Sequence, residues 1–379
     1  MDLSGKRVLL TTSHWSIGSG GSVQMLLLAR ALRAAGAHVE ALFKYRAGQT
    51  VDNSNLRPLV ELGVPLHFLR TNRWYSPRQI YRLRRILRQG RFDIVHTHKG
   101  GDLSLALLAG VGLRVPCLIN TRGVNFPLGL NRGKYNLRRL DRVIVVSEDS
   151  KRAMVECGVR AEKIRVIYGG VDAERFRPRP DLRGDVRAEL GLPTDAVVSL
   201  VVANLVRQKG HGDYLEAAAA LRAAQPRLHH VFAGSGDATP WRETAERLGV
   251  ADRVVFAGFR RDMERVYAAA DLSVMPGFAG EGVSGVLREA LACGVPVITT
   301  AVGGNAELIA DGVTGLVVPV RAPQALAEAI GRLAADAELR RRLAEAGREQ
   351  VLARYSAQAR AETIFALYAE VFAAKGLPF

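Results

Sequence analysis

Residues 271–300 read DLSVMPGFAGEGVSGVLREALACGVPVITT and contain a complete strand–loop–helix–strand pattern. The run DLSVM is typical of a short buried strand, and Gly277 and Gly280 then open a loop. From about Ser284 the apolar residues follow helical spacing as far as Gly294, and VPVITT then begins a second strand. A strand, a crossover helix and another strand in this order indicate a parallel α/β sheet.

The same alternation occurs along the whole chain, on both sides of one polar segment. Before residue 172 the apolar runs are RVLLTTS, HVEALF, PLHFL, DIVHTH, PCLINT and RVIVVS. Residues 173–195 are rich in Pro, Gly and charge, and the alternation then restarts. The pattern predicts two Rossmann-like α/β domains that face a cleft, residues 1–172 and 196–355, joined by a linker over 173–195. Residues 356–379 are predicted to form a helix that packs on either domain, and crossing back to the first is one option.

Composition limits the class of protein. The chain has 379 residues, of which 48% are hydrophobic, so it can bury two cores. Its three cysteines form no CxxC pair, which argues against a zinc site or a disulfide framework and suits a reducing compartment. The first apolar run resembles a strand more than a signal peptide. We therefore expect a cytoplasmic protein, with peripheral attachment to the inner face of the cell membrane left open.

The formal net charge of +16 is concentrated in two places. Residues 73–91 carry seven arginines, and residues 131–142 carry five further basic side chains. One explanation is a set of solvated helix faces, and the other is an anionic partner such as a membrane surface, a phosphorylated acceptor or a nucleic acid. Helical spacing predicts that Ile80, Leu83 and Leu87 face the core. The arginines expected in solvent are Arg78, Arg82, Arg85 and Arg88.

Two glutamates, Glu281 and Glu289, lie on either side of the predicted helix start in residues 271–300. The first N–H groups of a helix lack partners within the helix and favour a phosphate. A diphosphate at this point would leave Glu281 in the loop and Glu289 within reach of a ribose. The alternative is that both carboxylates serve only the helix dipole or the solvent. The backbone groups expected at the phosphates belong to Gly282, Val283, Ser284, Gly285 and Val286.

These residues resemble the GT-B glycosyltransferases of glycosyltransferase family 4, and the resemblance covers nearly the whole chain. Its most specific part is the pair of glutamates separated by seven residues, followed by VGGNAELIADGVTGLVVPV. The resemblance implies that Glu281 contacts the donor sugar and Glu289 the ribose of a nucleotide-diphosphate sugar. It also implies a retaining, hexosyltransferase-type enzyme of bacterial lipopolysaccharide or surface polysaccharide synthesis, with a glycan or lipid-linked acceptor.

Further matches extend the predicted site to both domains. IGSGGSVQM resembles the glycine loop of the family, which implies that Gly20 and Gly21 approach the donor phosphates or the acceptor. VVANLVRQKGH resembles the segment that neutralises the diphosphate, and there Lys209 matches the lysine of the family. Asn204 occupies the position where many members have arginine, and Arg207 is the candidate to replace it.

The resemblance also implies roles for four other residues. DIVHTH resembles the strand that brings His98 to the cleft. Arg122 stands where many members carry a histidine near the sugar, and an arginine there can hold a phosphate or an anionic acceptor but cannot act as a base. Phe259 and Arg260 follow VVFAG and are candidates near the nucleotide base.

No Asp-x-Asp motif occurs in the sequence, so we expect a metal-independent reaction with no cofactor besides the donor. A nucleotide-sugar epimerase of the same fold remains an alternative. A dinucleotide-dependent oxidoreductase would need G-x-G-x-x-G directly after the first strand, and the chain lacks it. A nucleic-acid-binding protein is a weaker alternative, since no reader motif occurs and aromatic residues are scarce among the arginines. We therefore expect no nucleic-acid partner.

Overall fold

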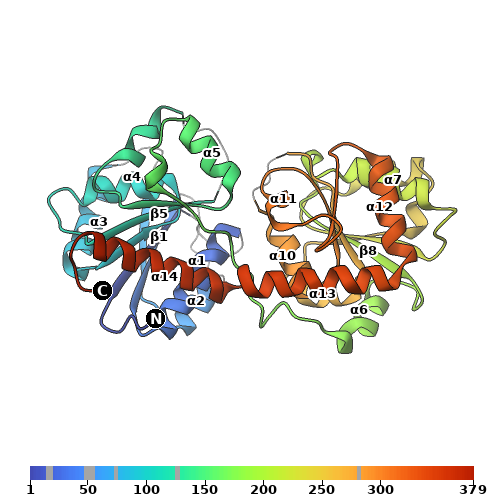
Figure 1. The fold of residues 1–379 in the computed structure, drawn as a ribbon, viewed down its shortest axis with the longest axis horizontal. Coiled ribbons are helices and arrows are strands. Elements are labelled where there is room, and N and C mark those ends of the chain that lie inside the picture. Colours follow the sequence, from blue (N-terminus) through green and yellow to red (C-terminus); the bar gives the residue numbers. More distant parts are fainter. Residues whose placement is uncertain (14–19, 47–55, 72–75, 124–128, 280–282) are drawn as a thin grey trace. The chain divides into compact units, whose positions relative to one another are not determined.

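A computed structural model of the chain describes residues 1–13, 20–46, 56–71, 76–123, 129–279 and 283–379. The chain forms two compact units. The first comprises Met1–Gly170 together with Ala357–Phe379, and the second comprises Val171–Ser356 (Figure 1). Each unit has its own parallel sheet covered by helices, as the alternation in the sequence predicts.

The first unit is built on a seven-stranded sheet with the order β3-β2-β1-β4-β5-β6-β7. Every described pairing in it is parallel. The strand order reverses between β1 and β4, and ligands of such sheets bind beyond the carboxyl ends of the strands at this point. The strands are β1 (Arg7–Thr12), β2 (His38–Arg46), β3 (Leu66–Thr71), β4 (Ile94–Thr97), β5 (Cys117–Arg122), β6 (Arg142–Val145) and β7 (Ile164–Val166).

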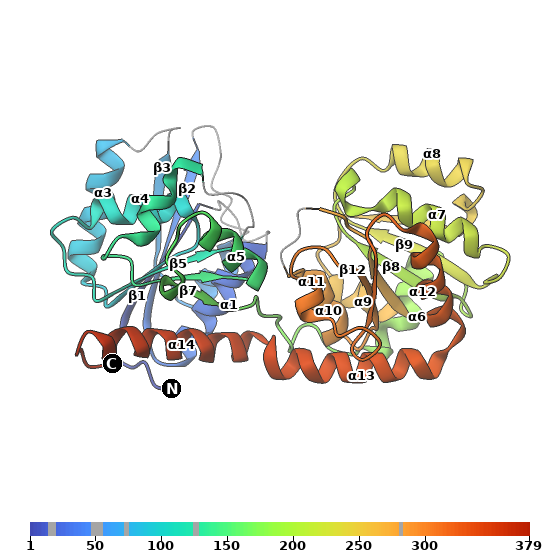
Figure 2. The same ribbon diagram turned by 45° about the horizontal axis from the view of Figure 1, so that its top comes forward.

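Helices cover both faces of this sheet (Figure 2). One core contains residues of α1, α2 and α14, and the other contains residues of α3, α4 and α5. The α-helices are α1 (Gly20–Ala34), α2 (Arg57–Glu61), α3 (Pro77–Gly90), α4 (Gly100–Ala109), α5 (Glu148–Glu156) and α14 (Ala357–Ala374). The short 3₁₀ helices are η2 (Gly129–Asn136) and η3 (Ala161–Lys163).

The last helix belongs to the first unit. Ile364 and Phe365 of α14 are buried in the core with α1. The Tyr368 hydroxyl hydrogen-bonds His96 Nδ1 at 2.6 Å, and both side chains are fully buried. A buried hydrogen bond between segments this far apart in sequence fixes the helix on the sheet.

The arginine-rich segment forms α3, and its faces agree with the predicted pattern. Leu83 and Leu87 are buried, and Ile80 is partly buried against the same core. Arg84 donates to the carbonyl oxygens of Ala109, at 3.2 Å, and Val111, and so holds the end of α4. The exposed arginines of the helix are Arg78, Arg82, Arg85 and Arg88.

The second unit has a six-stranded parallel sheet with the order β10-β9-β8-β11-β12-β13. Here the order reverses between β8 and β11. The strands are β8 (Val197–Val202), β9 (Leu228–Ala233), β10 (Val254–Gly258), β11 (Leu272–Met275), β12 (Val297–Thr300) and β13 (Leu316–Val318). The α-helices are α6 (Arg183–Glu189), α7 (His211–Leu221), α8 (Thr239–Arg247), α9 (Met263–Ala269), α10 (Gly285–Ala292), α11 (Asn305–Leu308), α12 (Pro323–Ala335) and α13 (Ala337–Arg354). The 3₁₀ helices are η4 (Pro180–Leu182), η5 (Arg207–Lys209) and η6 (Ala251–Arg253).

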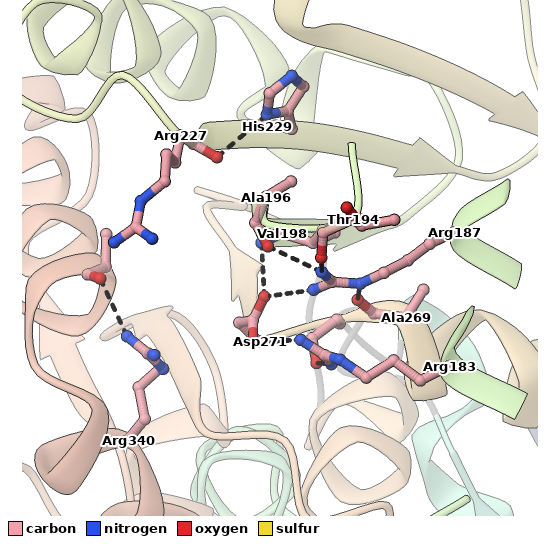
Figure 3. A network of polar contacts seen from close by, with 12 residues as sticks. Arg183, Arg187, Thr194, Ala196, Val198, Arg227, His229, Ala269, Asp271 and Arg340 are labelled. Carbon is pink, nitrogen blue, oxygen red and sulfur yellow. Dashed lines mark hydrogen bonds and ion pairs between the residues drawn. The ribbon is translucent and has the colours of Figure 1, made fainter. Parts of the chain in front are cut away.

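Residues 173–195, which the sequence suggests as a linker, are folded into the second unit. The helix α6 lies in this segment, and Figure 3 shows how two of its arginines reach Asp271. Arg183 and Arg187 form ion pairs with the two carboxylate oxygens of Asp271 at 2.6 and 2.7 Å. The same carboxylate accepts the backbone N–H of Val198 at 2.8 Å. Because Asp271 precedes β11 and Val198 lies in β8, the network ties α6 to the amino-terminal edge of the sheet.

Candidate active site

The loops after β8 and β11 pack directly on each other at the carboxyl edge of the second sheet. Gly210 has a positive φ of 73°, and a Cβ there would overlap the carbonyl oxygen of Pro276. Only glycine fits both conditions. The backbone N–H of Phe278 donates to the carbonyl oxygen of Gln208 at 3.0 Å. The turn that carries the predicted phosphate-binding cations is therefore fixed against the segment that leads to Glu281.

Arg207 and Lys209 lie in the same 3₁₀ turn, η5, immediately before α7. Arg207 is exposed and Lys209 is half-buried. Asn204 is exposed, and its backbone carbonyl oxygen forms a hydrogen bond with His211 Nε2 at 2.9 Å. Arg207 lines a pocket of about 380 Å³. The other lining residues are Gly210, Gly212, Asp213, Trp241, Phe278 and Arg321.

The start of α10 is positioned by a residue for which the sequence analysis predicts no role. The backbone N–H of Ser284 donates to Asn305 Oδ1 at 3.2 Å, and Asn305 Nδ2 donates to Thr299 Oγ1 at 3.3 Å. Asn305 is fully buried, and Ser284 is 8% exposed. The N–H of Ser284 is thus already bonded within the protein. This leaves the first helical residues, Gly285 and Val286, as the better phosphate donors of the predicted set.

Two carbonyl groups around this helix start also accept hydrogen bonds from side chains. Val283 is buried, and its carbonyl oxygen accepts from Arg288 Nη1 at 3.1 Å. The carbonyl oxygen of Val286 accepts from the Tyr267 hydroxyl at 3.2 Å. The sequence signal for Asn305 was a polar residue in the stretch VGGNAEL, shortly after β12. A single sequence does not reveal the partner of that residue.

Glu289 lies one helical turn beyond the start of α10. A Cβ built on Gly285 would lie 4.0 Å from Glu289 Oε1, so this carboxylate is next to the first residue of the helix. The Tyr267 hydroxyl donates to Glu289 Oε2 at 3.3 Å. Burial raises the pKa of Glu289, and the neighbouring Arg288 opposes that change. The spacing predicted from sequence is therefore present: a helix terminus with a carboxylate one turn away.

The other residues predicted to contact the nucleotide sugar do not all lie beside the start of α10. Glu281 and Gly282 lie outside the described residues. Phe259 follows β10 and is 63% exposed, which suits a flat surface for a base. Arg260 forms ion pairs with Asp262, at 2.7 Å, and with Glu189 of α6. Its guanidinium thus holds the loop after β10 on α6, a structural role that the sequence analysis did not anticipate.

In the first unit, His98 lies directly after β4, on a buried chain of polar side chains. Its ring stacks on that of His96, with centroids 4.6 Å apart. His96 hydrogen-bonds Tyr368 and, through Nε2 at 2.7 Å, Thr121. Burial lowers the pKa of His96 well below its usual value, and the adjacent His98 adds to the effect. The His98 ring is thus buried against the hydrogen-bonded His96 ring.

Gly20 and Gly21 form the exposed beginning of α1. A Cβ added to Gly20 would meet no atom within 4 Å among the described residues. The backbone there is open on one side, as a ligand-facing helix start requires.

In the described part of the chain, no group of three or more His, Cys, Asp or Glu side chains could hold a metal ion.

Arg122, at the end of β5, belongs to a cluster of basic side chains that the sequence analysis largely missed. Its guanidinium hydrogen-bonds the Tyr135 hydroxyl. Lys134 donates to the Gly100 carbonyl at 2.8 Å and to Ser104 Oγ at 3.0 Å. The other basic members are Lys44 and Lys99. The charge density of residues 131–142 pointed to Lys134, but the elements that carry the three lysines are far apart in sequence.

Two family descriptions together account for most of the chain. "Glycosyltransferase Family 4" matches residues 18–175, and "Glycosyl transferases group 1" matches residues 183–350. The chain belongs to the family 4 glycosyltransferases.

Two curated relatives carry the same name, D-inositol 3-phosphate glycosyltransferase. The protein from Streptomyces bingchenggensis is 33% identical over 283 residues, which is 68% of this chain and 62% of the relative. The protein from Corynebacterium urealyticum is 36% identical over 239 residues, 60% of this chain and 56% of the relative. The match to this glycosyltransferase chain thus spans less than two thirds of either relative.

Solved structures give the fold. A glycosyltransferase from Rickettsia africae has a TM-score of 0.87 and 21% identity, covering 97% of this chain and 98% of that one. Anabaena HepE, solved with UDP-glucose, has a TM-score of 0.80 and 21% identity, covering 96% and 99%. The fold of the chain is GT-B, with two parallel α/β domains.

Proposed function

We propose that this chain is a retaining, metal-independent glycosyltransferase that moves a hexose from a nucleotide-diphosphate sugar to an acceptor hydroxyl. The observation that carries the proposal is the edge of the second sheet at its switch point. There a turn with Arg207 and Lys209 packs on the loop after β11, and Glu289 lies one turn into the next helix. Cations, helix N–H groups and a carboxylate in this order suit a diphosphate followed by a ribose. The UDP-glucose bound by Anabaena HepE supports a uridine donor.

The reaction would break the bond between the anomeric carbon and the diphosphate oxygen. Lys209 and the first N–H groups of α10 would stabilise the negative charge that develops on the leaving diphosphate. The acceptor oxygen would form the new bond on the same face of the sugar, and its proton would pass to the leaving phosphate. Glu281 would contact the donor sugar, as the family resemblance implies.

The acceptor would be held by the first unit, in which His98, Arg122 and the start of α1 lie at the carboxyl edge of the sheet. A glycan or lipid-linked acceptor of bacterial surface polysaccharide synthesis would suit the exposed arginines of α3, which could dock on an anionic membrane from the cytoplasmic side. The relatives named for D-inositol 3-phosphate support a small phosphorylated acceptor instead. No helix in the described part of the chain is long and apolar enough to cross a membrane.

The test is a panel of nucleotide sugars screened by thermal shift, followed by turnover with candidate acceptors. A ligand that binds only the folded state raises the unfolding midpoint, so the true donor and its nucleoside diphosphate should both do so. The anomeric configuration of the product, read by NMR, tests retention, and turnover in excess chelator tests metal independence. Conversion of the donor alone into another nucleotide sugar would instead establish an epimerase. Failure of every nucleotide sugar to bind would overturn the proposal.

A further inference from the structure

The pocket of about 380 Å³ in the second unit contains more than the proposed donor contacts require. Its lining residues come from η5, α7, α8, the loop after β11 and the segment between β13 and α12. Neither Phe259 nor Glu289, the residues predicted at the base and the ribose, is among them. Arg207 is, so the pocket adjoins the turn proposed to hold the diphosphate. Its volume lies in the range of small-molecule sites, about 300–1,000 Å³.

Trp241 provides an aromatic wall of this pocket. Its ring meets the ring of the buried His211 edge to face, with centroids 5.2 Å apart. A Cβ added to Gly212 would lie 3.8 Å from Trp241 Cζ3, so the indole also borders the backbone of α7. Trp241 Nε1 has no hydrogen-bond partner in the described part of the chain. The indole is therefore packed on the start of α7 and retains an unused donor.

Three charged side chains line the same pocket without pairing. Asp213 lies in the first turn of α7, and Arg207 and Arg321 are the two cations. Asp213 Oδ2 is buried and has no hydrogen-bond partner among the described residues. No ion pair of 4.0 Å or less joins Asp213 to any residue that the structure describes. Arg321 instead lies over the Phe278 ring, with its guanidinium carbon 4.4 Å from the ring centroid.

This arrangement is unfavourable for the protein alone. A carboxylate in the first turn of a helix is ordinarily stabilised by the N–H groups there. Burial nevertheless raises the pKa of Asp213, and Arg321 opposes that change. Arg321 itself has a φ of 52°, in the left-handed region that favours glycine. An unpaired carboxylate and a backbone outlier around one pocket are typical of a binding site.

We propose that this pocket binds a pyranose ring, other than the sugar of the donor, through Trp241, Asp213 and Arg321. The carboxylate only accepts hydrogen bonds, and the indole N–H and the guanidinium only donate them, whereas each sugar hydroxyl can do both. The C–H groups on one face of a pyranose are apolar and can pack on the indole. The inference goes beyond the proposed function, which assigns no sugar to this pocket.

Charged ligands suit the pocket less well. An ammonium group would meet the repulsion of Arg207 and Arg321, and a phosphate or carboxylate would meet that of Asp213. A neutral ligand with several hydroxyl groups avoids both repulsions. A nucleoside is also neutral and could stack on the indole, so the experiment includes one.

The test follows the fluorescence of Trp241 while the whole protein is titrated with the methyl α-pyranosides of glucose, galactose and mannose. Trp241 is the only tryptophan after residue 74, and the changes Trp15→Phe and Trp74→Phe leave it as the sole reporter. Saturating nucleoside diphosphate is present to fill the proposed donor contacts. We expect a saturable change with at least one pyranoside. Glucitol, which has the hydroxyl groups but no ring, should produce none.

Asp213→Asn should weaken pyranoside binding about tenfold or more, because it removes a charged acceptor. Glu216→Gln is the matched control, since Glu216 is exposed on the same helix and does not line the pocket. It should leave pyranoside affinity unchanged. Urea unfolding tests for a merely structural role. Asp213→Asn should be no less stable than the parent, because burial disfavours the charged carboxylate.

Four results would overturn the inference. They are no saturable change with any pyranoside, equal affinity in Asp213→Asn and Glu216→Gln, a loss of stability in Asp213→Asn, and saturation by uridine or glucitol instead of a pyranoside. Nucleoside diphosphate affinity, measured separately by calorimetry, tests the donor site on its own. Failure of the pyranose site therefore remains distinguishable from failure of the proposed function.

Discussion

Ser284, which precedes helix α10, donates its backbone N–H to the side-chain oxygen of Asn305 at 3.2 Å. Asn305 in turn donates to Thr299 Oγ1, at the end of β12. Thr300, the next residue, donates through Oγ1 to the carbonyl oxygen of Gly277. Both described ends of the loop that carries Glu281 are thus fastened to the end of the same strand.

Asn305→Ala should therefore loosen the start of α10. It leaves the N–H of Ser284 and the hydroxyl of Thr299 without these partners, at a cost of about 1–3 kcal/mol in the free energy of unfolding. We expect weaker nucleotide binding as well, measured by calorimetry beside urea unfolding. Asn305→Asp keeps an acceptor for Ser284 and should restore much of the nucleotide affinity. Unchanged nucleotide affinity in Asn305→Ala would show that this contact does not position the site.

Glu289→Ala should weaken nucleotide binding, because the carboxylate is the expected partner of the ribose hydroxyls. Hydrogen bonds to a charged group contribute about 1.5–3 kcal/mol, so the dissociation constant should rise roughly ten- to hundredfold. Calorimetry with the nucleoside diphosphate and with its 2′,3′-dideoxy analogue separates the ribose contact from a general loss. If the two ligands differ as much in the variant as in the parent, the ribose assignment is wrong.

The nucleotide affinity should also depend on pH through Glu289. Burial raises the pKa of this carboxyl above its ordinary value of 4.5. The group then becomes protonated, and a poorer acceptor, as the pH falls through the raised pKa. Its contribution to stability has the opposite sign: the folded state binds the proton more tightly, so stability from this group falls as the pH rises from 4.5 through the raised pKa. Glu289→Gln should remove both dependences, and an unchanged profile would assign them to other groups.

Lys209→Ala should lower turnover more than nucleotide-sugar affinity. The charge on the diphosphate grows as the glycosidic bond breaks, so a cation at the β-phosphate stabilises the transition state more than the ground state. Arg207→Ala is the informative companion, because Arg207 lies in the same turn and Asn204 occupies the usual arginine position. A turnover defect in both variants would indicate that Arg207 takes the role of the arginine that is absent at position 204. Equal losses of affinity and turnover would make either residue a ground-state contact.

Arg187→Ala should destabilise the second unit by about 1.5–3 kcal/mol, because it removes a buried charged donor from Asp271 and from two backbone carbonyl oxygens, while Arg183 still pairs with Asp271. The Arg187 side chain is 6% exposed, and its guanidinium joins Asp271 to the carbonyl oxygens of Ala196 and Ala269. Arg222→Ala is the control, since its pair with Asp252 is exposed to solvent and should contribute little to stability. Urea unfolding of both variants tests the difference. Equal losses would show that α6 does not depend on the buried pair.

Much of the architecture could be predicted because local pattern determines it. The residues of β11, α10 and β12 have apolar spacings that allow one kind of element each, and the parallel order follows from their alternation. The Asn305–Ser284 contact and the Lys99–Lys134 cluster could not be predicted in the same way. Each joins groups whose proximity depends on strand order, which the spacing within one segment does not reveal. The segment 173–195 misled for a related reason: two of its arginines, Arg183 and the buried Arg187, pair with Asp271, and composition alone does not separate such charges from solvated ones.

The exposed face of α3 gives the last prediction, which concerns an anionic membrane. Each basic residue near an anionic leaflet contributes about 1 kcal/mol, so several on one face could produce reversible docking. The protein should sediment with vesicles containing anionic lipid at low salt and be released as salt screens the charges. Charge reversal at three positions should abolish sedimentation without changing nucleotide affinity. The positions are Arg82, Arg85 and Arg88, all exposed.

A matched variant separates this surface from the high net charge of the whole chain. Reversing three exposed arginines of the second unit changes the net charge equally but leaves α3 intact, so it should preserve most of the sedimentation. Suitable positions are Arg247, Arg332 and Arg342, which are exposed on α8, α12 and α13. If both triple variants lose vesicle binding to the same extent, attraction depends on total charge and not on α3. If the α3 variant binds vesicles as well as the parent does, its arginines are a solvated face.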